Sequence, residues 1–238
     1  GGGAAGLACA RSAASAGLSV ILADEQAEMG GSLRHRDGTI DGADAGDWGA
    51  AQARALAEAG VTVLPRTTVY GLYDDNLACM IERREGLNDA RGDRLWRVRA
   101  TRIVVAAGAI ERPMVFANND RPGVMSADAV QLYLKRHAVL AGARIVVATN
   151  NDTAYETVGA AVAAGADVTV VDARAESAAM AAARAHGAKV HAGSVPVDTR
   201  GAKGLESVEV VSVDGGESRR IDAEVLAVSG GWTPSVHL

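Results

Sequence analysis

Residues Gly1 to Gly6 read GGGAAG, which fits the pattern G-x-G-x-x-G of a phosphate-binding turn between a strand and a helix. The next residues, LACARSAASAG, form an alanine-rich helical pattern that ends at Gly17, and LSVILAD is a continuous apolar run typical of a buried parallel strand. This order predicts the first βαβ unit of a dinucleotide-binding fold. The sequence begins within the motif, and we expect independent folding and tight binding to depend on a strand ahead of Gly1.

Asp24 ends this predicted strand, at the spacing expected for an acid that accepts hydrogen bonds from a ribose 2′-hydroxyl. A carboxylate here would repel a 2′-phosphate, so the spacing favours NAD or FAD over NADP. Glu25 is a neighbouring candidate for the same role, and either acid is also compatible with a solvated strand end. Gly1 and Gly3 would let the backbone turn tightly and approach a pyrophosphate, while Gly6 would allow close packing of helix on strand.

Two further segments are candidates for contact with the dinucleotide. In EMGGSLRHR, a loop at Gly31 and Ser32 would present backbone N–H groups toward a second phosphate or ribose, or would form an ordinary turn. Ala107 and Gly108 lie at the end of the apolar run IVVAAGA, which predicts a strand. Small residues there would let the backbone pass close to the ligand, although a tight strand-to-loop turn needs the same residues.

The segments between these motifs complete the first unit. DWGAAQARALAEAG, from Asp47 to Gly60, predicts an amphipathic helix, and short β runs over about 61–99 predict a three-stranded β excursion. Arg112 and Arg121 are candidates for phosphate contacts or for surface ion pairs. We expect His35 on the surface, because the sequence shows no constellation that includes it.

A second βαβ unit is predicted from Ala143 onward, with the strand ARIVVAT, a helix in NNDTAYETVGAAVAAGA and the strand DVTVVDA. Asp172 follows its second strand as Asp24 follows that of the first unit. The loop from Thr149 to Ala154 contains no glycine, however, and Asp152 would place a negative charge beside a pyrophosphate. We therefore predict that this unit keeps the fold and has lost the ligand.

A hairpin around Asp214-Gly215-Gly216 and a final buried strand, EVLAVSGG, are predicted near the C-terminal end. The fold class is thus α/β, with two nested Rossmann-like βαβ units and a small β-meander insertion. The predicted domains are residues 1–112 with 201–238 for the first unit and 113–200 for the second.

Composition excludes several classes of protein. The net charge of −5 is spread along the 238 residues without a basic stripe, so nucleic acid is not expected as a partner. The two cysteines, Cys9 and Cys79, form no C-x-x-C pair, which argues against a disulfide framework, a zinc ribbon and a redox dithiol. No apolar run approaches the roughly 18 residues of a membrane span. We expect a cytoplasmic protein with no membrane association and no metal site.

The order of these elements resembles that of the two-dinucleotide-binding flavoprotein superfamily, which has a disulfide-reductase-like, FAD/NAD(P)-binding fold. Within it, five stretches are similar to the α subunits of heterotetrameric sarcosine oxidases: ADEQAEMGGSL, TTVYGLYDDN, RLWRVRA, AAGAIERPMVFANNDRPGVM and SGGWTPSVHL. Together they span nearly the whole chain. The resemblance covers the nucleotide-binding portion only, because the α subunits of that family also have an N-terminal region and a C-terminal folate-binding domain.

This resemblance implies an oxidoreductase complex that oxidises sarcosine to glycine with oxygen, forms hydrogen peroxide and passes the one-carbon unit to tetrahydrofolate. It implies FAD on a β subunit, FMN at the contact of the α and β subunits, and NAD in the first site of this chain. The partners it implies are β, γ and δ subunits, with a small-molecule amine as substrate. NAD would be structural or vestigial in such a complex, because the flavins carry out the redox steps.

Other functions stay open at this point. One is a self-contained, FAD-dependent NAD(P)H reductase; another is a subunit of an amine, proline or opine dehydrogenase; a third is a scaffold that keeps the nucleotide site for its shape. We predict no catalytic residue. The predicted cofactor-binding residues, for NAD or alternatively FAD, are Gly1, Gly3, Ala5, Gly6, Asp24, Glu25, Gly31, Ser32, Val69, Ala107 and Gly108.

Overall fold

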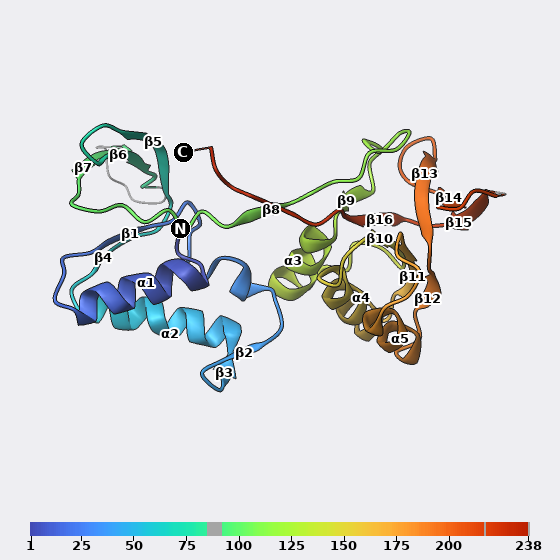
Figure 1. Cartoon of the computed structure of the whole chain (residues 1–238), viewed down its shortest axis with the longest axis horizontal. Helices are drawn as coiled ribbons and strands as arrows, with labels where there is room; N and C mark the ends of the chain where they lie inside the picture. Colours follow the sequence, from blue (N-terminus) through green and yellow to red (C-terminus); the bar gives the residue numbers. More distant parts are fainter. Residues whose placement is uncertain (85–91, 217, 238) are drawn as a thin grey trace. The chain divides into compact units, whose positions relative to one another are not determined.

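The structure is a computed structural model that describes residues 1–84, 92–216 and 218–237 (Figure 1). Its Cα positions divide the chain into two compact units, Gly1–Ala109 with Pro234–Leu238 and Ile110–Thr233. The boundaries expected from the sequence instead joined residues 201–238 to the first unit. The difference arises because β16 (Val225–Ser229) pairs in parallel with β10 (Arg144–Thr149), a strand of the second unit.

In the first unit, two helices accompany a short pair of parallel strands. α1 (Ala4–Ser15) follows the glycine loop, and β1 (Ile21–Ala23) pairs with β4 (Thr62–Leu64). α2 (Ala45–Glu58) confirms the predicted amphipathic helix. Asp44 is its N-cap, and the Asp44 carboxylate accepts hydrogen bonds from two N–H groups of the first turn. The short elements before it are η1 (Gly31–Arg34), β2 (Thr39–Ile40) and β3 (Ala43–Asp44). The core of this unit includes Leu7, Leu22, Trp48 and Leu56.

The predicted β excursion is confirmed as a three-stranded antiparallel sheet. Its strands are β5 (Thr67–Tyr73), β6 (Leu77–Glu82) and β7 (Arg94–Arg99), with a bulge in β5 between Val69 and Gly71. Residues 85–91, which the prediction also assigned to the excursion, lie outside the described residues.

The predicted strand over IVVAAGA is wrong for most of its length. β8 (Ala109–Glu111) begins only at its last residue and pairs with β17 (Trp232–Pro234). Residues 103–107 belong to no strand, because a strand requires a hydrogen-bonded neighbour and the described part of the chain supplies none there. Val104 and Val105 are accordingly 64% and 53% exposed.

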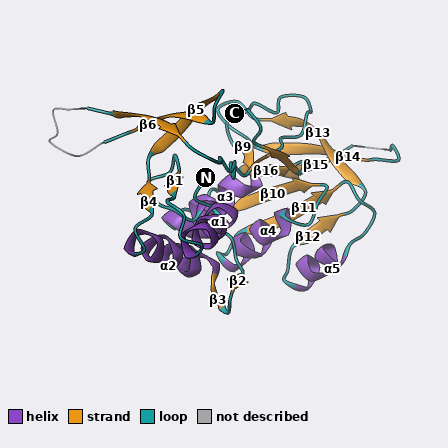
Figure 2. Ribbon diagram, turned by 60° about the vertical axis from the view of Figure 1, so that its left-hand side comes forward, coloured by secondary structure: helices purple, strands orange, loops and turns teal. Residues whose placement is uncertain are grey.

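The second unit is built on a five-stranded parallel sheet in the order β12-β11-β10-β16-β9 (Figure 2). Alternate residues of β10 enter two different cores: Ile145 and Val147 pack with the helices, whereas Val146 and Ala148 pack with a three-stranded antiparallel sheet on the other face. The remaining elements are β9 (Val124–Ser126), α3 (Ala127–His137), α4 (Ala154–Ala163), β11 (Asp167–Asp172), α5 (Ala178–Ala185), β12 (Lys189–His191), β13 (Ser194–Arg200), β14 (Ser207–Ser212) and β15 (Arg219–Asp222). The predicted hairpin lies between β14 and β15, as expected.

Candidate functional site

The glycine loop of the first unit packs so closely that two of its positions cannot carry a side chain. A Cβ added to Gly6 would lie 1.8 Å from the carbonyl oxygen of Gly1, and a Cβ added to Gly1 would lie 2.1 Å from that of Ala106. Gly6 therefore lets α1 pack directly on the loop, and Gly1 lets the loop pass against residues 106–107. Both glycines serve close backbone approach, as the motif predicts.

Gly3 is open by contrast. A Cβ built on it would meet nothing nearer than the Cα of Gly31, at 4.0 Å, and its φ of −75° is one that any residue adopts. Gly3 is also the N-cap of α1, and no side chain of the described residues caps this helix. The first N–H of the helix to reach a backbone acceptor is that of Leu7, which donates to Gly3 O at 2.9 Å. The N–H groups of the first turn, Ala5 among them, are therefore available to an anion.

The carboxylate of Asp24 lies directly beside this loop. One oxygen accepts a hydrogen bond from Gly2 N–H at 2.5 Å, and the other accepts from Gln26 N–H at 2.8 Å. A carboxylate has about four acceptor positions, so lone pairs remain for a ribose hydroxyl. Sequence reasoning missed Gly2, whose N–H positions the acid. Glu25 is exposed, and no contact with the loop is recorded for it among the described residues.

The second glycine loop packs against the first. Gly30 N–H donates to Gly2 O at 2.8 Å, and a Cβ added to Gly31 would lie 3.0 Å from the Cα of Gly3. Both Gly30 and Gly31 have positive φ angles, +124° and +54°, which favour glycine. Ser32, the next residue, is exposed at the start of η1.

The remaining predicted residues lie on the segments that border this loop. Val69 is on β5, whose first residue, Thr67, donates its N–H to Asp24 O at 2.7 Å. Ala107 is next to Gly1, since a Cβ on Gly1 would lie 3.6 Å from the Cα of Ala107. Gly108 has a φ of +74° and makes the turn that follows. The structure thus brings Asp24, Gly31 and Ala107 against the glycine loop, whereas Glu25 and Ser32 are exposed.

The corresponding loop of the second unit is filled by its own side chains. Asn151 donates to both oxygens of Ser229, at 3.1 Å each, and its side-chain oxygen accepts from the N–H of Thr153 at 3.1 Å. The indole N–H of Trp232 donates to the Thr153 hydroxyl at 2.9 Å. These contacts take up the start of α4, where a pyrophosphate would bind in an intact site.

An ion-pair cluster closes the same loop on its other side. The guanidinium of Arg174 lies 2.8 Å from Asp152 and 2.8 Å from Asp172, whose side chain is fully buried. The Tyr155 hydroxyl donates to Asp172 at 2.9 Å, and burial, followed by this hydrogen bond, raises the pKa of the phenol. The hydrogen bond to Asp172 raises the pKa of Arg174. Asp172, the acid equivalent to Asp24, is thus bonded to groups of its own unit.

Three other candidate side chains have structural contacts. Arg121 donates to the carbonyl oxygens of Thr199 and Gly201, and Arg112 donates to the Thr233 hydroxyl at 3.2 Å. Neither arginine forms an ion pair within the described ranges, and both donate to oxygens of the second unit instead. The expectation that His35 is a surface residue is wrong, because the side chain is 7% exposed.

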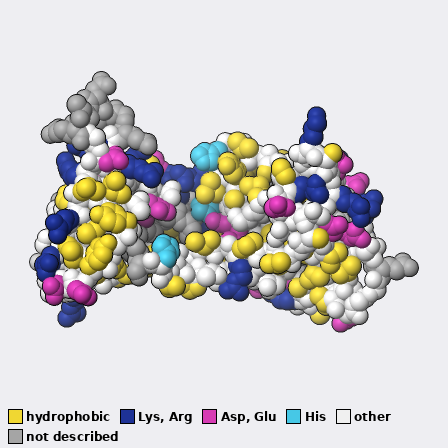
Figure 3. Space-filling view, turned by 90° about the horizontal axis from the view of Figure 1, so that it is seen from above, with side chains coloured by type: hydrophobic (Ala, Val, Ile, Leu, Met, Phe, Trp, Pro, Cys, Tyr) yellow, Lys and Arg dark blue, Asp and Glu magenta, His cyan; other side chains and the backbone are white. Residues whose placement is uncertain are grey.

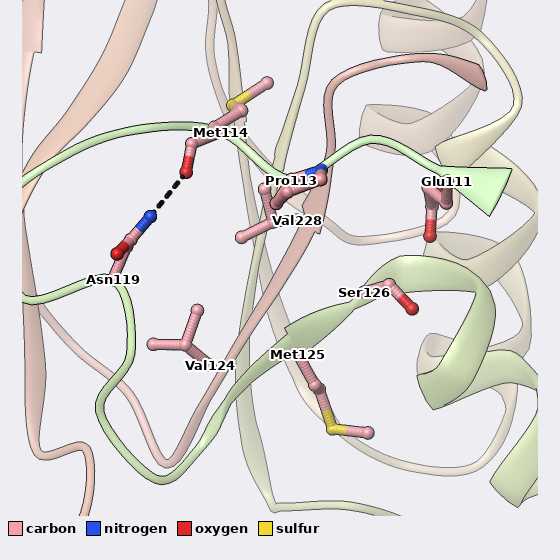
Figure 4. A pocket seen from close by; sticks show the side chains of 8 residues that line it. All are labelled: Glu111, Pro113, Met114, Asn119, Val124, Met125, Ser126 and Val228. Carbon is pink, nitrogen blue, oxygen red and sulfur yellow. Dashed lines mark hydrogen bonds between the residues drawn. The ribbon is translucent and has the colours of Figure 1, made fainter. Parts of the chain in front are cut away.

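A small pocket of about 140 Å³ lies within the second unit, between β9, β16 and the segment that follows β8 (Figure 4). Its polar groups already bond to the fold: Glu111 accepts from Asp128 N–H at 2.7 Å, at the start of α3, and Asn119 donates to Met114 O at 3.0 Å. We therefore assign it no ligand. The residues that line it are Glu111, Pro113, Met114, Asn119, Val124, Met125, Ser126 and Val228.

Across the described ranges, no group of three or more His, Cys, Asp or Glu side chains is arranged to hold a metal ion. None of the helices in these ranges combines the length and the apolar character that a bilayer span requires.

Comparison with curated proteins confirms the resemblance seen in the sequence. The chain is 48% identical over its whole length to the alpha subunit of the sarcosine oxidase of Corynebacterium sp. (strain P-1), and 39% identical to that of Rhizobium meliloti (strain 1021). It spans about a quarter of these relatives, 26% and 24% of their lengths. The A subunit of the opine oxidase of Agrobacterium tumefaciens (strain Ach5) is 31% identical over 72% of the chain, and the match covers 35% of that protein.

Solved structures agree on the fold. The thioredoxin reductase of Lactococcus lactis matches 99% of the chain with a TM-score of 0.77 and 19% identity, and the match covers 77% of that protein. The L-proline dehydrogenase of P. horikoshii matches 98% of the chain with a TM-score of 0.73 and 21% identity, over 41% of its own length. The family described as pyridine nucleotide-disulphide oxidoreductase matches residues 1–238. The chain therefore belongs to the pyridine nucleotide-disulphide oxidoreductase family.

Proposed function

We propose that this chain is the nucleotide-binding part of the α subunit of a sarcosine oxidase-like complex and that it holds one NAD molecule at the first glycine loop. The observation that carries the proposal is the contrast between the two loops. The first has an open position at Gly3, an uncapped helix N-terminus and an acid at ribose spacing. The second is filled by Asn151 and closed by Arg174.

The residues of the first loop fit a dinucleotide. The N–H groups at the start of α1 would bind the pyrophosphate, and the absence of a side chain on Gly3 leaves room for its oxygens. Asp24 would accept hydrogen bonds from the adenosine ribose and would disfavour a 2′-phosphate. When bound, a pyridine nucleotide supplies hydride chemistry, and a flavin supplies electron transfer to oxygen. This chain's residues bind and orient the group, and we assign none of them a proton-transfer step.

The proposed reaction takes place in the assembled complex. The relatives are named as the alpha subunit of sarcosine oxidase and the A subunit of opine oxidase. These names support an oxidase of a secondary amine, with sarcosine as the first substrate to test. We propose that the flavins act on or beside β-, γ- and δ-type subunits, where the amine is oxidised, hydrogen peroxide forms and the one-carbon unit passes to tetrahydrofolate. The closed second loop argues against a self-contained reductase, which needs a second nucleotide site.

The direct test is to denature the purified full-length protein and identify the released nucleotide by mass and absorbance. NAD in about equal amount to protein, without flavin, is the expected result. Release of FAD instead would refute the assignment of NAD to this loop and would indicate that the redox reaction takes place in this subunit. Release of no nucleotide would refute the proposal and would indicate that the loop has only a structural role.

A pair of variants shows whether the nucleotide sits at this loop. Gly3→Val should empty the site while the fold is retained, because an added Cβ meets only the Cα of Gly31, at 4.0 Å, and φ is compatible. The matched control is Gly159→Val in α4, where an added Cβ meets nothing within 4 Å. Unchanged nucleotide content in Gly3→Val would contradict the assignment of the loop.

A further inference from the structure

The sheet β5–β6–β7 has one face that packs inside the first unit and one that does not. Side chains alternate across a strand, and Met80, at 3% exposure, and the half-buried Trp96 are directly paired on the inner face. Trp96 also donates its indole N–H to Glu82 at 2.8 Å on that face. The opposite face carries Tyr70, Tyr73, Leu95, Arg97 and Arg99, which we call the tyrosine–arginine face.

Its two tyrosines lie beside identifiable neighbouring residues. The ring of Tyr73 lies over Gly71, since a Cβ there would be 2.7 Å from the ring. Loss of solvent raises the pKa of Tyr70, the Cys79 thiol raises it further, and the charge of Arg97 opposes the shift. Tyr70, Cys79 and Arg97 are therefore neighbours on this face. The two tyrosines form an aromatic surface, and a tyrosine side chain loses little conformational freedom on binding because it has only two χ angles.

This surface is exposed despite its apolar content. Tyr70, Tyr73 and Leu95 are 53%, 57% and 68% exposed. Figure 3 shows hydrophobic side chains with basic side chains beside them on the part of the surface that the first unit forms. Clustered Tyr and Arg are the side chains that interfaces between proteins favour.

The second unit shows that the fold does not require such a face. β13–β14–β15 is also a three-stranded antiparallel sheet, and its inner residues Val208 and Val210 are buried. Among its described residues, the exposed side chains of β15 include Arg219 and Arg220, and none of its strands carries an exposed tyrosine. The aromatic cluster on β5 is therefore a feature of the first sheet alone.

Charge indicates the kind of occupant. Arg97 is exposed, and no ion pair is recorded for it within the described residues, whereas Arg99 pairs with Asp75 at 3.0 Å. A second copy of this chain that met this face with its own tyrosine–arginine face would bring together two surfaces of like charge, which is unfavourable. A surface with carboxylates beside apolar side chains would complement the face.

We propose that the tyrosine–arginine face is a docking surface for a partner subunit of the oxidase complex, which contributes an apolar patch bordered by Asp or Glu. The proposal rests on the proposed function, because it presumes that the chain belongs to a multisubunit oxidase. The two tyrosines and Leu95 supply the desolvated centre of the contact. Arg97 supplies a charge-assisted contact that fixes its orientation.

The test reconstitutes the complex from the purified full-length protein and its purified partner subunits, with the dissociation constant measured by calorimetry. Arg97→Glu and Tyr73→Ser should each weaken assembly by roughly tenfold or more, as expected for a central interface residue. Arg220→Glu, on the exposed part of the second sheet, is the matched control and should leave assembly unchanged. Raising the salt concentration should weaken wild-type assembly more than that of Arg97→Gln.

Two outcomes would overturn the proposal. If Arg97→Glu and Tyr73→Ser both assembled with the wild-type dissociation constant, no partner would use this face. Normal assembly with a lower melting temperature of the free subunit would show that another part of the same polypeptide covers it. If the wild-type subunit formed no complex at all, the proposed function itself would fail, and the nucleotide-release experiment would show whether the binding site survives that failure.

Discussion

Removal of the Arg174 guanidinium tests whether the second loop is closed by its own charges. Arg174 donates to Asp172 through Nε at 3.1 Å and Nη2 at 2.8 Å, and also pairs with Asp152. In Arg174→Gln, Asp172 keeps the hydroxyl of Tyr155 and one backbone N–H, but loses its counter-charge in a fully buried position. Breaking a buried pair in this way costs about 3–5 kcal/mol.

The expected loss extends below the lower end of this range. The Arg174 side chain is 32% exposed, so water reaches part of the gap that the variant leaves. The exposed contact to Asp152 adds little. We therefore expect the free energy of unfolding of the second unit to fall by about 2–4 kcal/mol. For a unit of this size, that loss lowers the melting temperature by roughly 10 °C.

Hydrogen exchange of the full-length protein, followed by mass spectrometry, measures this loss locally. Peptides from β10, β11 and α4 should exchange faster in Arg174→Gln, while those of the first unit should not change. Lys189→Gln is the control, because its pair with Asp167, at 3.1 Å, is exposed and contributes about 0–1 kcal/mol. Adding Asp172→Asn to Arg174→Gln removes the orphaned charge and should restore part of the stability. Equal exchange in Arg174→Gln and Lys189→Gln would refute the reasoning.

Two further predictions concern charge at the ends of strands. Asp24→Asn should weaken NAD binding by roughly 10- to 100-fold, because it removes the charge from a hydrogen bond to the ribose. Calorimetry on the nucleotide-free protein measures the affinity. An unchanged affinity would show that another residue contacts the ribose. Burial, followed by the charge of Arg219, lowers the pKa of His191 below its usual 6.5, so the unfolded chain takes up the proton first. Stability from this residue is present above pH 6.5 and lost as the pH falls through the lowered pKa. Urea midpoints between about pH 5 and pH 7.5 should therefore vary less in His191→Gln than in wild type, and equal slopes would contradict this assignment.

The close packing of the first glycine loop was predictable, because it is a requirement on the backbone. No Cβ fits at Gly1 or Gly6, so both positions must be glycine. The spacing of these obligatory glycines is visible directly in the sequence. The position of Asp24 follows from the length of one helix and one strand. The role of Gly2 was missed because any residue has an N–H group, so a donor of this kind leaves no mark in the sequence.

The contacts of the second loop were predictable only in part. The missing glycines and Asp152 indicated that a pyrophosphate would not fit. The groups that replace it were not foreseeable, because Ser229 and Trp232 lie about 80 residues further along the chain than Asn151 and Thr153, and only the parallel pairing of β16 with β10 brings them together. The strand expected over IVVAAGA failed for a related reason, since an apolar run predicts a buried strand only where neighbouring strands exist.

The two loops together limit how electrons can pass through this chain. A reductase of this fold needs a nicotinamide site in its second unit, and in this chain the equivalent acid, Asp172, is occupied by Arg174 and Tyr155. Opening that site would require breaking a buried ion pair, which is a much larger change than the side-chain movements that ligands usually induce. Reducing equivalents from a free pyridine nucleotide therefore have no entry at the second unit. This supports the division of labour proposed above, in which the first loop would retain one nucleotide and the amine would be oxidised at flavins held with partner subunits.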